Sequence, residues 1–329
     1  MKFCVYTRAF HENPFLDFFI EHYIKLGFDK IIILKSDNIP YECPNEYIDY
    51  IDIHIVKNLG NKLITKYDYL IKNSIYDWIL CIDIDEILLL NEKYKNIHEF
   101  VEEKLLLNKD INIFFFRWAM IEKYNTSDDN SLTDILVNYK IFTNKFIKHM
   151  VKRTELLNFR DPHFSNMKKQ VCIYFENNII NQNNTIHNFS IHMYKESVLL
   201  HIHTRSIHNS ILKSFITVLH QKKIKNKNNF INYINNFDNT KDDDKLFKKF
   251  NEYIGKKCSL VFAHSKNKYI TLENFRIPEY KNKLFERTKD EASIINCLNQ
   301  NNVNITKYFQ FIEKINTHIN ENFKNLLFN

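Results

Sequence analysis

The sequence predicts an α/β protein: a mostly parallel central sheet flanked by helices, followed by a helical C-terminal extension. Short apolar runs alternate with longer amphipathic stretches over roughly the first 120 residues. Near the C-terminus, apolar residues recur at three- and four-residue steps. A chain of 329 residues with 44% hydrophobic and 15% aromatic residues can also bury one large core or two modest ones. We place a domain boundary after residue 220, with the sheet domain at 1–220 and the extension at 221–329.

The first predicted elements alternate between strand and helix. Residues 2–6 predict a strand, and Pro14 opens a helix that Gly27 closes, in the usual arrangement of an N-terminal Pro and a C-terminal Gly. Strand, helix and strand at this spacing predict right-handed crossovers and a parallel sheet covered on both faces. Ligands of such sheets bind at the carboxyl ends of the strands. Further strands are predicted at residues 31–34, 51–56 and 78–84, with a helix over 62–73.

The later predicted elements are shorter, and we expect the sheet to close near residue 205. The polar residues 124–134 and the Asn-rich residues 177–184 are interpreted as loops. Beyond residue 249 the pattern is mostly helical. Strands are predicted over 111–118, 144–153, 170–175 and 198–204, and helices over 97–107 and 206–223.

Composition excludes several classes of protein. With only 3 Gly, the chain has neither a GxGxxG dinucleotide loop nor a Walker-type phosphate loop. The net charge of +7 is mild, and the basic residues 222–249 are interleaved with acids, which favours a solvated face over a nucleic-acid groove. No apolar run reaches the ~18 residues that span a bilayer. We expect no transmembrane segment, although the helical tail leaves peripheral membrane contact open.

The cysteines and the first residues bear on the compartment. The six cysteines include no CxxC pair, so buried, reduced thiols are the simplest interpretation. The opening sequence is typical of a strand and not of a secretion signal. We therefore expect a cytoplasmic, reducing environment.

The sharpest motif is the segment from Trp78 to Leu90, in which acids interrupt an apolar run. On an extended strand Asp83 and Asp85 would point to the same face. Two adjacent buried carboxylates repel each other and lose hydration, which a bound Mn²⁺ or Mg²⁺ would offset. The plain alternative is that the strand ends at residue 82 and the acids begin a solvated loop.

A metal held by carboxylates on a fold without a phosphate loop suits nucleoside-diphosphate chemistry, because the cation offsets charge on a departing diphosphate. Three stretches, spanning about residues 3–215, make the sequence resemble a GT-A-fold glycosyltransferase of the family-2-like and family-92-like group. They are residues 4–27, 77–86 and 201–213, beginning Cys-Val-Tyr-Thr-Arg, Asp-Trp-Ile-Leu-Cys and His-Ile-His-Thr-Arg. The sequence departs from the family pattern at His11, which replaces an Asn, and at Ile202, which replaces a Tyr.

The resemblance implies roles for individual residues. The nucleoside would be held by Thr7, Arg8, Glu12 and Asp37. Asp83 would serve the ribose side and share the metal site. Asp85 and His201 would hold the metal, Glu86 would orient hydroxyls of the donor sugar, and Arg205 and Lys213 would contact phosphate.

The general base is less closely defined by the sequence. An inverting transfer needs a carboxylate to accept the proton of the acceptor hydroxyl. Glu122 and Asp161 are the two candidates, and both are also explained as ordinary loop acids. His163, close to the second candidate, could instead contact the donor sugar. A retaining enzyme would need neither carboxylate.

The residues themselves predict an acidic metal site at the end of a parallel sheet. The resemblance implies a metal-dependent glycosyltransferase that moves a sugar from a UDP-sugar donor to a hydroxyl of a glycan, protein or lipid-linked acceptor with inversion. An Asp-x-Asp phosphatase or phosphotransferase is disfavoured, because residue 87 is Ile and the motif is on the fourth predicted strand, whereas that chemistry needs its nucleophilic Asp on the first. A non-catalytic scaffold that keeps a transferase fold remains the alternative.

Overall fold

The computed structural model describes residues 1–10, 12–37, 39–56, 61–121, 131–138, 141–161, 163–168, 171–182, 194–202, 227–238, 269–284, 287–300 and 302–314. The chain forms two compact units. The first contains the described residues up to 202 together with 269–284, and the second contains 227–238 and the described residues from 287 onward. The predicted boundary at residue 220 lies outside the described residues.

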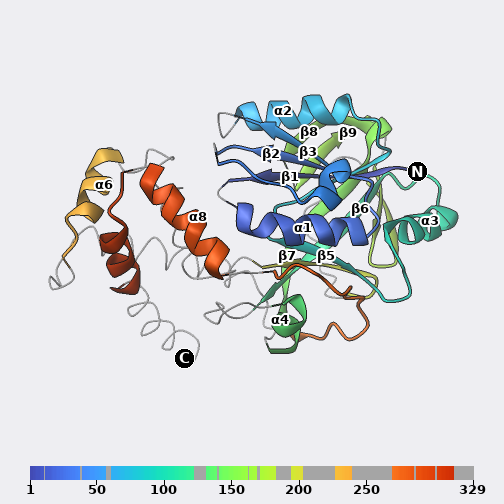
Figure 1. Ribbon diagram of the computed structural model, residues 1–329. Coiled ribbons are helices and arrows are strands. Elements are labelled where there is room, and N and C mark those ends of the chain that lie inside the picture. The colour runs from blue at the N-terminus through green and yellow to red at the C-terminus, as the bar shows by residue number, and fades with distance from the viewer. Residues whose placement is uncertain are drawn as a thin grey trace. The chain divides into compact units, whose positions relative to one another are not determined.

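A large mixed sheet organises the first unit (Figure 1). Its N-terminal half, in the order β4-β1-β2-β3, is parallel throughout. On the other side of β4 lies β7, which runs antiparallel to β4 and also to β6. The order continues from β6 to β10 and β11. The strands are β1 Phe3–Ala9, β2 Lys30–Lys35, β3 Ile51–Ile55, β4 Trp78–Cys81, β6 Ile113–Ile121, β7 Ile141–Lys152, β10 Val171–Phe175 and β11 Asn178–Gln182.

Additional strands extend the sheet beside β6. The strand β12 (Ser197–His201) pairs in parallel with β6 and antiparallel with β5 (Glu86–Leu90). The strand β13 (Tyr269–Ile270) pairs antiparallel with the start of β7. A separate hairpin is formed by β8 (Leu156–Asp161) and β9 (Phe164–Met167). The sheet is thus assembled from segments far apart in the sequence.

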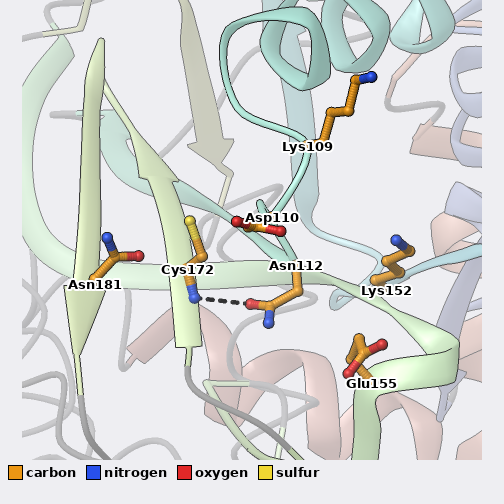
Figure 2. A pocket seen from close by; sticks show the side chains of 7 residues that line it. All are labelled: Lys109, Asp110, Asn112, Lys152, Glu155, Cys172 and Asn181. Atoms are coloured by element: carbon orange, nitrogen blue, oxygen red, sulfur yellow. Dashed lines mark hydrogen bonds between the residues drawn. The ribbon is translucent and has the colours of Figure 1, made fainter.

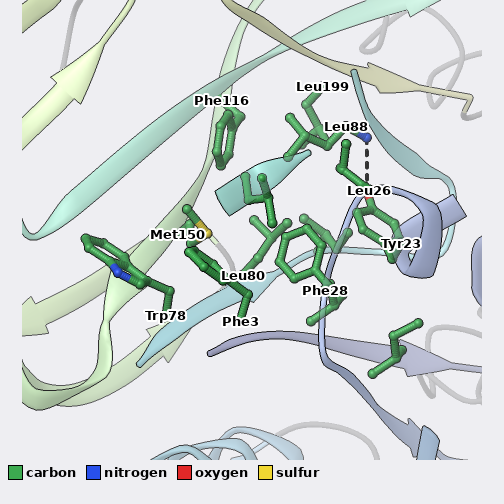
Figure 3. Packing of buried hydrophobic residues seen from close by; sticks show 14 of the residues in the cluster. Phe3, Tyr23, Leu26, Phe28, Trp78, Leu80, Leu88, Phe116, Met150 and Leu199 are labelled. Carbon is green, nitrogen blue, oxygen red and sulfur yellow. Dashed lines mark hydrogen bonds between the residues drawn. The ribbon is translucent and has the colours of Figure 1, made fainter. Parts of the chain in front are cut away.

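Helices cover both faces of the parallel half. The apolar side of α1 (Asn13–Lys25) packs with alternate residues of β1, such as Phe3 and Val5, in one core cluster. On the other face, Tyr67 of α2 (Asn61–Lys72) belongs to a second cluster with Tyr6, which is in the other alternate set of β1 residues. The alternation of side chains along a strand explains why one strand serves two cores. Figure 3 shows the α1-side cluster, which packs around residues such as Leu80 and Met150.

The end of α1 is fixed by Gly27, the residue that the sequence pattern predicts to close the helix. Its φ of 92° lies in the left-handed region, which an L side chain rarely adopts. A Cβ at this position would also lie 3.0 Å from the Cβ of Asn96, which caps α3 (Ile97–Leu107) by accepting a hydrogen bond from Glu99 N. The turn therefore needs glycine for both its conformation and its space.

The α/β class and the helices flanking the sheet are confirmed by this architecture. Three local predictions were wrong. The strand predicted at 78–84 ends at Cys81, residues 178–182 of the predicted Asn-rich loop form β11, and α4 (Leu132–Asn138) begins inside the predicted loop 124–134. The sequence analysis also did not separate β5, β8, β9 and β13 as strands. The helix predicted at 206–223 lies outside the described residues.

The second unit is helical where it is described. It includes α6 (Lys227–Asn235), α8 (Arg287–Gln300) and helical residues 305–314. Tyr233 and Phe311 meet edge to face with ring centroids 6.0 Å apart. Ile294 and Leu298, which predicted helical spacing, are both buried.

Two further observations concern the described residues only. No disulfide joins the cysteines at positions 4, 43, 81, 172 and 297. Within the described ranges, no helix combines the length and the apolar character needed to cross a bilayer.

Candidate active site

The predicted acidic motif lies directly after β4, at the carboxyl end of the parallel half of the sheet. Residues 83–86 form a turn in which Glu86 N donates to Asp83 O at 3.1 Å and Asp83 N donates to Glu86 Oε2 at 2.7 Å. The expectation that Asp83 and Asp85 share one face of an extended strand is therefore wrong, because a turn brings the acids together instead. Glu86 is fully buried and Asp85 is 7% exposed.

A buried lysine from β7 lies in this acidic turn. Lys148 Nζ is 2.8 Å from Asp83 Oδ2 and 3.3 Å from Glu86 Oε1, and its side chain is fully buried. The antiparallel register pairs Leu80 with Met150, so Lys148 reaches just beyond the end of β4. The sequence analysis predicted a strand over 144–153 and did not identify Lys148 as a site residue. No local signal distinguishes this lysine, because β7 also contains Lys145 and Lys152.

The charges of this cluster shift one another's pKa values. Burial alone would raise the pKa of Asp83, but Lys148 and Arg8 outweigh it and hold that pKa well below the usual range. Burial raises the pKa of Glu86 to about 7, against the opposing effect of Lys148. Burial would lower the pKa of Lys148, yet Glu86 and Asp83 outweigh burial and raise it. The lysine is therefore cationic at neutral pH.

The pairing of β5 with β12 brings His201 to the acidic turn. His201 is the register partner of Glu86, and Ile202 N donates to Asp85 O at 2.8 Å. His201 Nε2 lies 3.6 Å from Asp85 Oδ1. Two residues separated by more than 100 positions, both proposed from the sequence as metal ligands, are thus neighbours in the structure.

Residues of β1 approach the same edge of the sheet. Arg8 Nε donates to Asp83 Oδ1 at 3.0 Å, and the Arg8 side chain is 53% exposed. Thr7 is fully buried and belongs to the alternate set of β1 residues, on the opposite face from Arg8. The structure therefore brings Arg8, but not Thr7, to the acidic turn.

Two other predicted donor residues follow the ends of β1 and β2. Glu12 precedes α1, and its Oε2 accepts from Phe10 N at 3.4 Å. Asp37 forms an ion pair with the buried Lys35 and accepts from Ile39 N at 3.0 Å. Burial lowers the pKa of Lys35, although Asp37 and Glu12 oppose this shift. Glu12, Lys35 and Asp37 thus lie at or just after the carboxyl ends of β1 and β2.

An aromatic surface lies next to the acidic turn. Trp118, which is half-buried near the end of β6, has its ring centroid 4.2 Å from that of His201 and 5.4 Å from that of His163. Lys148 Nζ is 5.7 Å from the Trp118 ring centroid. His163 is exposed, and its Nδ1 is 2.8 Å from Ile147 O. Trp118 was not among the residues that we selected from the sequence.

The remaining predicted residues divide into two groups. Asp161 ends β8, and its side chain is not described. The second group lies outside the described residues: Glu122, Arg205 and Lys213.

The fit of a divalent cation depends on the Asp85 and His201 pair. Two ligands of one ion, each with a bond of about 2.1 Å, lie roughly 3 Å apart in octahedral geometry, close to the observed 3.6 Å. Within the described part of the chain, no group of three or more His, Cys, Asp or Glu side chains is arranged as a metal site. Asp83 is instead in contact with Arg8 and Lys148. The residues fit a cation held by two protein ligands and completed by other oxygen atoms.

A separate cavity of about 450 Å³ opens at the opposite end of β4 (Figure 2). Lys152, which lines it, pairs with Trp78 at the start of that strand, whereas Asp83 follows its end. Asn112 uses its Oδ1 to accept a hydrogen bond from Cys172 N at 3.0 Å, which closes one wall. The acidic and basic side chains that line this cavity are typical of an ordinary polar surface, and none of the predicted site residues lines it.

Comparisons with known proteins give only distant similarity. No protein-family model matches the sequence, and no curated protein matches it significantly. Among solved structures, Staphylococcus aureus TarS superimposes with a TM-score of 0.34 at 6% identity, covering 73% of this chain and 43% of that chain. A TarS fragment, residues 1–349 in complex with UDP, gives a TM-score of 0.33 at 7% identity, covering 86% of this chain and 98% of that one.

A CMP:2-keto-3-deoxy-manno-octonic acid synthetase in complex with CTP has a TM-score of 0.26 at 11% identity, and the match covers 47% of this chain and 75% of that chain. The chain spans less than half the length of the first TarS structure. Likenesses at these TM-scores carry no functional argument, so the assignment below depends on the site itself.

Proposed function

We propose that this protein is a metal-dependent glycosyltransferase with a GT-A-type fold. It would transfer a sugar from a nucleotide-sugar donor, a UDP-sugar, to a hydroxyl of a glycan, protein or lipid-linked acceptor, with inversion of configuration. The observation that carries this proposal is the turn at the end of β4, where three acids meet His201 and two cationic side chains. The sequence resemblance described above supports it independently of the geometry.

The position of the site suits a nucleotide ligand. Open α/β sheets bind ligands outside the carboxyl ends of their strands, and this edge collects charged residues after β1, β2 and β4. Arg8 is half exposed beside Asp83, so its guanidinium can donate to phosphate or ribose oxygens. The half-buried ring of Trp118 offers an apolar face for a sugar.

Asp85 and His201 would hold Mn²⁺ or Mg²⁺, which when bound supplies a positive charge that stabilises the departing diphosphate. Glu86 orients the site by accepting the backbone N–H of Asp83. Asp37, Glu12 and Arg8 are proposed for the nucleoside, and Arg205 and Lys213 for phosphate. Thr7, which is fully buried on the opposite face of β1 from Arg8, is left out of this proposal. Glu122 and Asp161 are the proposed candidates for the base that accepts the acceptor proton.

Calorimetric titration with UDP, GDP and their sugars, with and without Mn²⁺, tests the proposal. We expect metal-dependent binding of a uridine nucleotide that Asp85→Ala abolishes. The matched control is Asp110→Ala, because Asp110 lines the cavity at the opposite end of β4 and its loss leaves the site intact. If every nucleotide fails to bind the folded, metal-loaded protein, the transferase proposal is wrong and a non-catalytic scaffold takes its place.

A further inference from the structure

Lys148 is a charged side chain that folding has removed completely from water. Its relative exposure is 0%, and its ammonium group lies between two carboxylates that come from a different part of the chain. Transferring a lone ammonium into the protein interior costs several kcal/mol unless opposite charges compensate. Asp83 and Glu86 supply that compensation at 2.8 and 3.3 Å.

The charge count of the acidic turn limits its affinity for a metal ion. With Glu86 ionised and His201 neutral, the three carboxylates of Asp83, Asp85 and Glu86 face the two cations of Lys148 and Arg8, which leaves a formal charge of −1. The affinity of oxygen-rich sites for divalent cations depends on the number of charged ligands. A site with this residual charge is weak for a divalent ion on its own.

We propose that Lys148 is a resident cation of the donor site and a positioning residue for Asp83 and Glu86. Its ammonium holds these two carboxylates in the turn, so the divalent ion is confined to the Asp85 and His201 pair. The remaining coordination positions are then filled by diphosphate oxygens of the donor. This inference rests on the proposed function for its ligand, and it adds that the metal enters together with the nucleotide.

The inference is tested by Mn²⁺ binding without nucleotide, measured from the thermal unfolding midpoint over a Mn²⁺ titration and from the paramagnetic resonance of bound Mn²⁺. In Lys148→Met, Glu86 loses its cation and Asp83 keeps only Arg8, so both carboxylates become available as ligands. We expect Mn²⁺ to bind Lys148→Met at least about tenfold more tightly than wild type. Saturating Mn²⁺ should therefore raise the thermal unfolding midpoint of the variant by about 2–4 °C more than it raises that of wild type.

Two variants serve as controls. Lys148→Arg keeps the positive charge and should respond to Mn²⁺ as wild type does. Lys95→Met removes a lysine whose side chain is 79% exposed and should also leave the response unchanged. Equal Mn²⁺ responses of Lys148→Met and wild type would overturn the inference.

If Lys148→Met does not fold, the double variant Lys148→Met with Glu86→Gln removes one cation and one carboxylate together. It should bind Mn²⁺ more tightly than Glu86→Gln alone, because Asp83 becomes a ligand beside Asp85 and His201. Equal affinities would again overturn the inference. Because these measurements contain no nucleotide, they stand even if the titration with UDP fails, and the two proposals can fail separately.

Discussion

Several buried charged residues in the described part of the chain lie in compensated groups. Besides Lys148, the buried Lys104 lies 2.7 Å from Glu196 Oε2 and donates to Tyr94 Oη at 2.6 Å. His22 is fully buried with its Nε2 2.9 Å from Leu88 O, and burial lowers its pKa to about 4. Glu196 and Leu88 come from distant segments, whereas Tyr94 lies close to Lys104 in the sequence. Single residues therefore connect α1, β5 and β7 to the candidate site.

Substitution of Tyr23, a residue of α1, tests whether a single side chain connects this helix to β5. Its hydroxyl donates to Glu86 O at 2.9 Å and accepts from Leu88 N at 3.1 Å, so it anchors the start of β5. Tyr23→Phe leaves both backbone groups without this partner and should lower the free energy of unfolding by about 1–3 kcal/mol in urea titrations. Tyr69→Phe, at a position that is 60% exposed, is the control and should change little. Equal stability of the two variants would contradict the anchoring role.

At the element scale, the long amphipathic elements follow the sequence pattern closely. The helix predicted over 97–107 has those bounds in α3, and the predicted strand 31–34 lies within β2. Short strands such as β11 and β5 were not predicted as strands, because pairing with β10 and β12 defines them and local alternation does not. Pairing is a long-range property that a short sequence window does not contain.

The hairpin between β10 and β11 carries a pH-sensitive carboxyl group. Glu176 is 3% exposed at this turn, and its Oε2 accepts from Lys195 N at 2.7 Å. Burial raises its pKa from 4.5 to about 7, so between these values the folded state binds more protons than the unfolded state. Its contribution to stability is therefore fully present below pH 4.5 and is lost as the pH rises through about 7.

Glu176→Gln keeps an acceptor oxygen and removes the titration. Between pH 5 and 8, the free energy of unfolding of wild type should fall by on the order of 2 kcal/mol more than that of the variant. Glu42→Gln, at an exposed position, should follow wild type. The measurement is urea unfolding at several pH values, and parallel pH profiles for wild type and Glu176→Gln would refute the expectation.

At the scale of the whole molecule, residues 269–284 belong to the sheet unit although they follow much of the helical unit in the sequence. Arg276 N donates to Leu90 O at 2.9 Å, and Lys281 N donates to Glu21 Oε1 at 2.8 Å. Leu272, Phe275 and Leu284 are buried in the cluster that contains Ile87 and Leu200. This segment therefore supports both β5 and β12, which carry Glu86 and His201.

Truncation distinguishes this arrangement from two units that are consecutive in the sequence. A fragment of residues 1–220 lacks the three buried side chains of that segment, whereas a fragment of residues 1–285 keeps them. Because each such side chain stabilises by about 1.5–3 kcal/mol, the shorter fragment should melt at least about 5 °C below the longer one. Equal midpoints by circular dichroism would show that residues 269–284 add nothing to the sheet unit.

The sequence by itself determined the α/β class and the presence of an acidic motif at the fourth predicted strand, and it predicted His201 as a second metal ligand. Apolar periodicity and interrupted apolar runs are local properties, so a single sequence is enough to recognise them. Only the tertiary structure decided that a turn gathers the acids, that Lys148 enters them from β7 and that Arg8 reaches Asp83 while Thr7 faces the other core. These contacts depend on strand register and on the compensation of buried charge between distant segments, and neither is encoded in local spacing.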